Sequence, residues 1–127
     1  MKDFEKGLVG LYDDLMIGPG YTFEDFKKSR YFCNQDGILI VDLEEKVYID
    51  GRCYLACLFF RNGAIYMLSL ICCDRKFSEI DEPKRKAFHD EILKGYGIEG
   101  KQEYSWGSIS SDYDSRGNVS SINLVYN

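Results

Sequence analysis

The sequence has no apolar run that approaches the about 20 residues a membrane-spanning helix needs. Its longest apolar stretch, around 54–60, has the length of a β-strand. Residues 1–16 also differ from a secretory signal, because Asp3 and Glu5 interrupt the basic region and no long apolar core follows. We therefore expect a cytoplasmic protein with no contact to a membrane.

Positive charge is also scarce. The chain has 16 Lys and Arg against 21 Asp and Glu, so its formal net charge is −5. Proteins that bind nucleic acids usually carry a basic surface. We therefore expect no nucleic-acid partner, whereas an acidic surface is compatible with a basic protein partner. The paired acids at 13–14, 44–45 and 81–82 are expected to be solvated at element ends or in loops.

The residue patterns of catalytic, metal and cofactor sites are missing. His89 is the single histidine, and a Cys–His nucleophilic pair would also need a group that orients the imidazole. The cysteine spacings at 53/57 and 72/73 do not suit zinc, and the acidic loop at 112–117 has Arg116 where calcium needs an oxygen ligand. The glycines in 95–100 follow a predicted helix, so they do not form a dinucleotide-binding turn. We predict a structural or surface role for His89, no catalytic residue, no metal and no cofactor.

The stretch 46–73 is the most informative part of the chain. Asp50-Gly51 and Asn62-Gly63 suit two-residue type I′ turns, in which both central residues have positive φ. The sequence therefore predicts an antiparallel meander with strands over 46–49, 52–61 and 64–73.

The second turn also predicts a register. Cys57 should lie opposite Leu68, and Cys53 opposite Cys72, so that a Cys53–Cys72 disulfide is conceivable; we expect reduced thiols packed in the sheet instead. Both faces of this meander are apolar, which differs from an antiparallel sheet with one wet side. Helices can cover one face, and the other needs more helix, a second sheet layer or a partner chain. The face opposite Cys57 is predicted to hold Tyr54, Ala56, Leu58 and Phe60 with Ile65, Met67, Ser69 and Ile71.

The remaining segments complete a predicted single α+β domain over 1–127. Apolar residues at spacings of three and four predict a helix over 3–17, and Thr22 with Asp25 forms a capping box for a helix over 22–30. A strand is expected over 38–43 and a third helix over 82–95, capped by Asp81 with Pro83 in its first turn. Strands over 104–110 and 119–126 form a C-terminal hairpin. The expected fold is a curved antiparallel sheet of five to six strands packed against two N-terminal helices and one later helix.

The aromatic content, 10 Tyr, 8 Phe and 1 Trp, suits either core packing or an interface. Our first hypothesis is a non-catalytic protein-binding module, such as an inhibitor or immunity-type protein that acts on a basic partner, or a homodimer formed through the sheet. The alternative is a small-molecule-binding domain or weak enzyme with an apolar pocket between sheet and helix. The residues predicted to contact a partner are Tyr54, Leu58, Phe60, Ile65, Met67, Tyr104, Trp106 and Tyr113.

Overall fold

The computed structural model describes residues 2–33 and 40–127, and it begins with a small antiparallel sheet. This sheet contains β1 (Lys2–Asp3), β2 (Leu8–Tyr12) and β3 (Leu15–Ile17), with a 3-10 turn, η1 (Phe4–Lys6), between the first two strands. The helix predicted over 3–17 is therefore wrong.

Two features explain why this segment forms strands. Val9 and Leu11 alternate on one strand, as do Leu15 and Ile17 on the next, and all four side chains are buried. The same residues also fit a helical period, so the pattern alone does not decide between the two structures. Gly7 adopts a φ of 71°, which a right-handed helix cannot contain.

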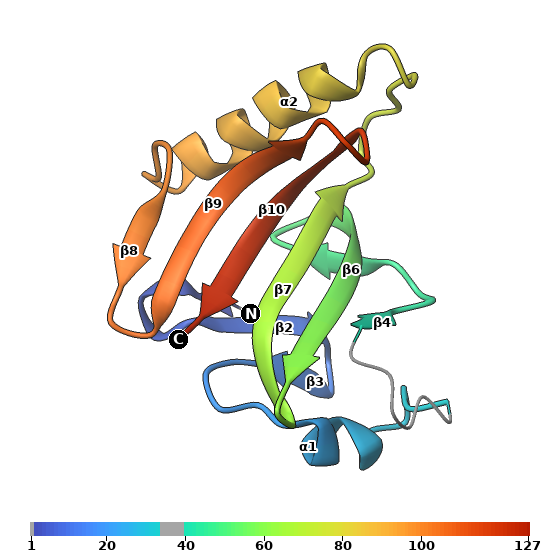
Figure 1. Ribbon diagram of the computed structural model, residues 1–127, viewed down its shortest axis with the longest axis vertical. Coiled ribbons are helices and arrows are strands. Elements are labelled where there is room, and N and C mark those ends of the chain that lie inside the picture. Colours follow the sequence, from blue (N-terminus) through green and yellow to red (C-terminus); the bar gives the residue numbers. More distant parts are fainter. Residues whose placement is uncertain (1, 34–39) are drawn as a thin grey trace.

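Seven further strands of the described chain form a curved antiparallel sheet (Figure 1). Its order is β4-β6-β7-β10-β9-β8, and β5 also pairs with β6. The predicted five- to six-stranded sheet with three helices is therefore wrong, because the observed sheet is larger, a second sheet replaces the first helix, and the described residues hold two α-helices. Of the strand predicted over 38–43, residues 38–39 lie outside the described residues. The strand bounds are β4 (Ile40–Asp42), β5 (Val47–Ile49), β6 (Arg52–Arg61), β7 (Ala64–Cys72), β8 (Gln102–Tyr104), β9 (Gly107–Asp114) and β10 (Val119–Tyr126).

Both predicted tight turns of the meander are confirmed. Asp50 and Gly51 have φ angles of 51° and 79°, and Asn62 and Gly63 have 52° and 78°. Positive φ at both central residues is the requirement of the type I′ turn. The predicted strands over 52–61 and 119–126 coincide with β6 and β10.

The predicted register between β6 and β7 is wrong beyond the first pairs, because the ladder contains a bulge. Phe60 pairs with Ile65, but Phe59 pairs with Met67, so Tyr66 is an extra residue on β7. One extra residue moves every following side chain of that strand to the opposite face. Tyr54 consequently pairs with Cys72, the residue that we expected opposite Cys53.

Because of the bulge, the side chains of β7 divide between a covered inner face and an outer face of the sheet in a way that the predicted register did not give. Leu68, Leu70 and Cys72 join the inner face and are at most 4% exposed. Met67, Ser69 and Ile71 are only half-buried and share the outer face with their partners on β6, which are Phe59, Cys57 and Leu55.

The two α-helices lie where their local signals place them. In α1 (Phe23–Lys27), Asp25 N donates to Thr22 Oγ1 at 3.0 Å and Thr22 N donates to Asp25 Oδ2 at 3.1 Å, which completes the predicted capping box. α2 (Glu82–Gly95) has the predicted bounds and Pro83 in its first turn. Asp81 precedes it but does not make the predicted side-chain cap.

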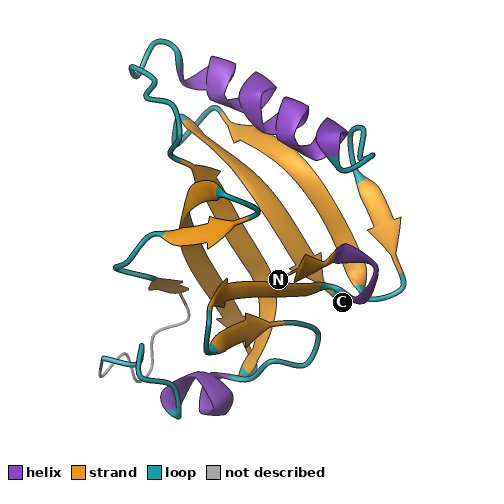
Figure 2. Cartoon of the chain, turned by 180° about the vertical axis from the view of Figure 1, so that it is seen from behind, coloured by secondary structure: helices purple, strands orange, loops and turns teal. Residues whose placement is uncertain are grey.

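α2 and the small sheet both cover the inner face of the seven-stranded sheet (Figure 2). α2 packs on β9 and β10, and its buried apolar side chains are Phe88, Ile92 and Leu93. The small sheet is attached to the C-terminal strands by two long-range hydrogen bonds: Trp106 Nε1 donates to Phe4 O at 2.8 Å, and Tyr126 OH donates to Gly7 O at 3.0 Å. The core is therefore closed by segments from both ends of the described chain.

Gly107, at the start of β9, provides a test of this architecture. Its φ is 153°, and a Cβ atom there would lie 1.9 Å from Val125 O on β10. We expect Gly107→Ala to lower the free energy of unfolding by about 3 kcal/mol or more, because the strands must separate locally. Urea unfolding followed by circular dichroism measures this change.

Gly95→Ala is the matched control. Gly95 ends α2 without a positive φ, and a Cβ atom added there would meet no packed neighbour within 4 Å. We expect the free energy of unfolding to stay within about 1 kcal/mol of the wild-type value. Equal losses in the two variants would contradict the close approach of β9 and β10 at Gly107.

Candidate functional site

The structure separates the eight residues predicted to contact a partner into two groups. Five of them are buried, with exposures of 8% or less: Tyr54, Leu58, Phe60, Ile65 and Trp106. Met67, Tyr104 and Tyr113 are partly exposed and lie on three different strands, β7, β8 and β9. A partner can reach these three side chains in the folded protein but not the five buried ones.

The space between the sheet and α2 is almost filled. The small cavity there, bordered by Tyr54, Leu70 and Ile92, has a volume of about 10 Å³. That is room for about one water molecule. The closed fold therefore holds no ligand-sized apolar pocket at this place.

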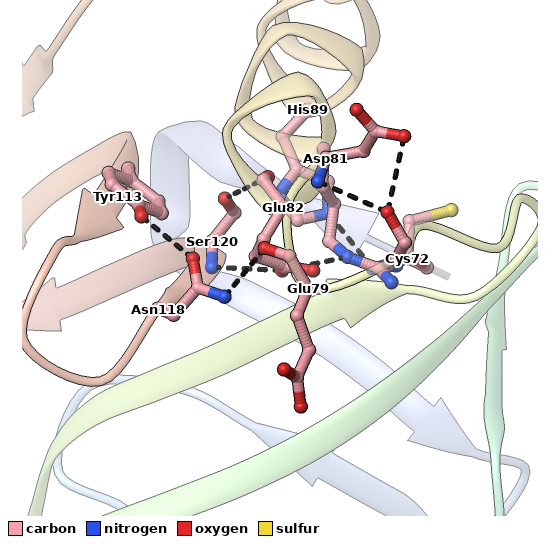
Figure 3. Close-up of polar contacts among 10 residues, drawn as sticks. Cys72, Glu79, Asp81, Glu82, His89, Tyr113, Asn118 and Ser120 are labelled. Atoms are coloured by element: carbon pink, nitrogen blue, oxygen red, sulfur yellow. Dashed lines mark hydrogen bonds and ion pairs between the residues drawn. The ribbon is translucent and has the colours of Figure 1, made fainter.

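A polar cluster joins the start of α2 to two strands (Figure 3). Glu82 Oε1 accepts from Arg85 Nε at 2.9 Å and from Ser120 N at 3.3 Å, and Arg85 Nη1 donates to Cys72 O at 2.6 Å. Both charged side chains are largely buried, at 14% and 13% exposure. Because each of these polar groups has a partner within the fold, the cluster serves to position α2 against β7 and β10.

His89 belongs to the same region and is fully buried. Its Nε2 accepts a hydrogen bond from the backbone N–H of Cys72 at 3.0 Å, so the neutral ring carries its proton on Nδ1. Burial, with a smaller contribution from the Arg85 charge, lowers the pKa of His89 to about 4. At neutral pH the imidazole is thus an uncharged acceptor that supports the end of β7, which is a structural role.

A different surface has the properties of a binding site. We define the acidic tyrosine groove as the open groove bordered by Tyr12, Asp13, Tyr31, Glu45 and Tyr48, with a volume of about 520 Å³. Its walls come from the β2–β3 hairpin, the segment after α1, and the connection from β4 into β5. The volume lies within the range of ordinary ligand sites.

The groove is held in shape by its own side chains. The rings of Tyr12 and Tyr31 stack with centroids 4.4 Å apart. Tyr12 OH donates to the carbonyl oxygen of Glu45, and Tyr31 OH donates to Asp14 Oδ1. Arg30 Nε lies 3.0 Å from Asp14 Oδ2 and also donates to Tyr31 OH. These contacts join three segments of the chain that are distant in sequence.

Negative charge surrounds the groove. Asp13 and Glu45 line it, and Asp42 and Glu44 line the smaller hollow that adjoins it. The cation that lines the groove is Arg30, and it already forms an ion pair with Asp14. Burial and the Glu45 charge raise the pKa of Tyr12, so its hydroxyl stays protonated and neutral. The groove therefore suits a positively charged group.

Sequence reasoning did not identify this groove. Its signals were the acid pairs at 13–14 and 44–45, which we had assigned to solvation, and the tyrosines at 12, 31 and 48. These residues come together only because β2 lies beside β5. No periodicity within either segment indicates that contact.

The outer face of the large sheet is apolar and incompletely covered. One cross-strand row contains Ile40, Phe59, Met67 and Val125, of which Ile40 and Val125 are 50% and 38% exposed. In Figure 1 this sheet lies in front of α2 and the small sheet, which cover its other face. Among the described residues, no helix or second sheet packs over this row.

Comparisons with protein-family models, with curated proteins and with solved structures found no match to this chain. In the part of the chain that the structure describes, no helix has the length and apolar character needed to cross a membrane. Over the same residues, no group of three or more His, Cys, Asp or Glu side chains is arranged to hold a metal ion.

The buried imidazole predicts a specific pH dependence of stability. Because the pKa of His89 is about 4 in the folded protein and about 6.5 in the unfolded chain, the unfolded chain binds the extra proton between these values. Stability is therefore lost as pH falls through this window, by about 2 kcal/mol at pH 5 relative to pH 7. Urea unfolding at both pH values measures the loss.

His89→Gln is the control, since an amide oxygen can still accept from Cys72 N–H but does not titrate. We expect the wild-type protein to lose about 2 kcal/mol more than this variant between pH 7 and pH 5. Equal losses in the two proteins would show that His89 is not held neutral by the fold.

Proposed function

We propose that this chain is a non-catalytic protein-binding module whose acidic tyrosine groove receives basic side chains of a protein partner. The observation that carries this proposal is that three tyrosines and two carboxylates, Asp13 and Glu45, line one open groove. It accords with the net charge of −5. Neutralising a basic partner is the action expected of an inhibitor or immunity-type protein.

Physical chemistry supports a basic protein as the occupant. Tyrosine is enriched among the residues that dominate binding energy, because it contributes a large rigid surface and a polar group. A lysine or arginine over a tyrosine face gains about 0.5–2 kcal/mol, and nearby carboxylates accelerate association with a cationic surface. Tyr48, 66% exposed, is the most accessible ring in the groove.

The groove is also prepared for binding before a partner arrives. Stacking and hydrogen bonds already fix Tyr12 and Tyr31. Ordering a long side chain on association costs roughly 0.5–1.5 kcal/mol, and this cost is avoided where the side chain is already held. The single histidine takes no part, since it is buried on the face of α2 that packs against the sheet.

A short arginine-rich peptide tests the proposal, with the full chain observed by heteronuclear NMR. We expect the largest shift changes at Tyr12, Tyr31, Glu45 and Tyr48. Asp13→Lys with Glu45→Lys should weaken binding by roughly tenfold or more at low salt, because opposite charges become like charges. Both side chains are exposed, so the fold should be retained.

The matched control places the same charge change elsewhere. Glu91→Lys with Glu99→Lys alters exposed residues outside the groove, and we expect less than about a threefold change in affinity, since screening limits distant charges. If both double variants weakened peptide binding equally, the loss of affinity would come from the change in net charge alone, which would contradict the proposal.

Self-association is the competing outcome, and light scattering over a concentration series measures it. A dimer that Phe59→Asp disrupts and the groove variants leave intact would indicate the outer sheet face as the interface instead. A monomer that binds the peptide in the groove supports the proposal.

A further inference from the structure

Two cysteine side chains meet on the outer face, at the end where β6 begins and β7 finishes. Cys73 Sγ donates a hydrogen bond to Cys53 Sγ at 2.8 Å, and Cys73 N donates to Cys53 O at 2.9 Å. Because Tyr54 pairs with Cys72, Cys53 and Cys73 occupy the next cross-strand position on the opposite face. This pairing follows from the bulge at Tyr66, which displaces Cys72 from the position opposite Cys53.

We propose that Cys53 and Cys73 are a redox-active pair that closes to a cross-strand disulfide when the protein meets a hydroperoxide. The inference does not depend on the proposed protein-binding function.

The backbone already has the geometry that a disulfide needs. Cys73 N donates to Cys53 O, and Cys53 N donates to Asp74 Oδ1 instead of to Cys73 O, so one of the two backbone bonds of a hydrogen-bonded antiparallel pair is present. Residues paired in this way have Cα atoms about 5.5 Å apart, within the range of about 4.4–6.8 Å found across disulfides. The two sulfur atoms are in direct contact, so bond formation requires a small side-chain movement. The strands themselves need not shift.

The two thiols have different roles in this step. Burial, together with the hydrogen bond to Cys53, raises the pKa of Cys73 to about 11, so Cys73 keeps its proton and acts as the donor. The Cys53 sulfur is the acceptor of this hydrogen bond, and a thiolate is the nucleophilic form of a cysteine. Cys53 is therefore the attacking sulfur and Cys73 the resolving one.

The atoms and electrons balance with one hydroperoxide. The Cys53 thiolate attacks a peroxide oxygen, which breaks the O–O bond, forms a sulfenic acid and releases hydroxide. The Cys73 sulfur then attacks the Cys53 sulfur, and water leaves with the Cys73 proton. The released hydroxide takes up the proton that Cys53 lost and becomes the other water molecule. In total, two thiols lose two protons and two electrons, and hydrogen peroxide is reduced to two water molecules.

Cys72 and Cys57 are placed differently. Cys72 is fully buried and faces inward. Cys57 shares the outer face but lies opposite Ser69, and burial with the neighbouring Asp42 raises its pKa. Cys57 is thus a half-buried thiol on the same strand as Cys53 without a cysteine opposite, which makes it the matched control.

The Cys53–Cys73 pair lies beside the acidic tyrosine groove. Tyr48 is the cross-strand partner of Cys53 on β5, and it also lines the acidic tyrosine groove. A hydrogen bond with Cys53 raises the pKa of Tyr48. Formation of the disulfide removes this hydrogen bond of Tyr48. Oxidation of the pair therefore changes a contact of a residue that lines the groove.

The test treats the reduced full chain with a small excess of hydrogen peroxide and maps the products by mass spectrometry. We expect a monomer that has lost two hydrogens and whose cross-linked peptides contain Cys53 and Cys73. Cys53→Ser and Cys73→Ser should each abolish this product, whereas Cys57→Ser should form it at the wild-type rate. Circular dichroism verifies that each variant is folded.

A second measurement uses the wild-type protein alone and needs no serine variant. The disulfide closes a loop from 53 to 73, so the oxidised wild-type protein should unfold at a temperature higher by about 5 °C or more than the reduced protein. Linkage between other cysteines, sulfinic acid at Cys53 without a cross-link, or an unchanged unfolding temperature would each overturn the proposal.

Discussion

The extra residue at Tyr66 decides which side chains of β7 enter the core and which face outward. Without it, Met67, Ser69 and Ile71 would face the core, and Leu68, Leu70 and Cys72 would face outward. The bulge sends the three residues that are at most 4% exposed to the covered side. It also places Cys73, rather than Cys72, opposite Cys53. The composition of both sheet faces, and the thiol pair, thus follow from one irregularity in one ladder.

The inner face that results is covered by two elements from different parts of the chain. α2 is positioned by the Glu82–Arg85 cluster and by His89, which together bind the backbone at Cys72 and Ser120. The small sheet is held by Trp106 and Tyr126, which bond to carbonyls of the N-terminal segment. His89 Nδ1 is the one buried side-chain nitrogen or oxygen atom among the described residues without a hydrogen-bond partner. Because buried polar groups cost stability unless they are paired, the paired atoms specify one arrangement of these layers.

The surfaces that remain are those available for function. The outer sheet face retains an apolar row, and the acidic tyrosine groove forms where the small sheet meets β5 and the segment after α1. Tyr48 belongs to β5, lines the acidic tyrosine groove, and is the cross-strand partner of Cys53. The proposed binding site and the proposed redox pair are therefore adjacent although each rests on separate observations.

Features with local causes can be predicted from the residue pattern. Asp-Gly and Asn-Gly specify both type I′ turns, Thr22 with Asp25 specifies the start of α1, and apolar spacing with Pro83 specifies α2. Contacts between distant segments are the reason that the N-terminal segment forms strands, that β7 contains a bulge and that three tyrosines share a groove. Residues 3–17 fit two periods, and the choice between them depends on the sheet that covers them. Bulges and grooves depend on contacts between distant segments, which no local pattern of residues records.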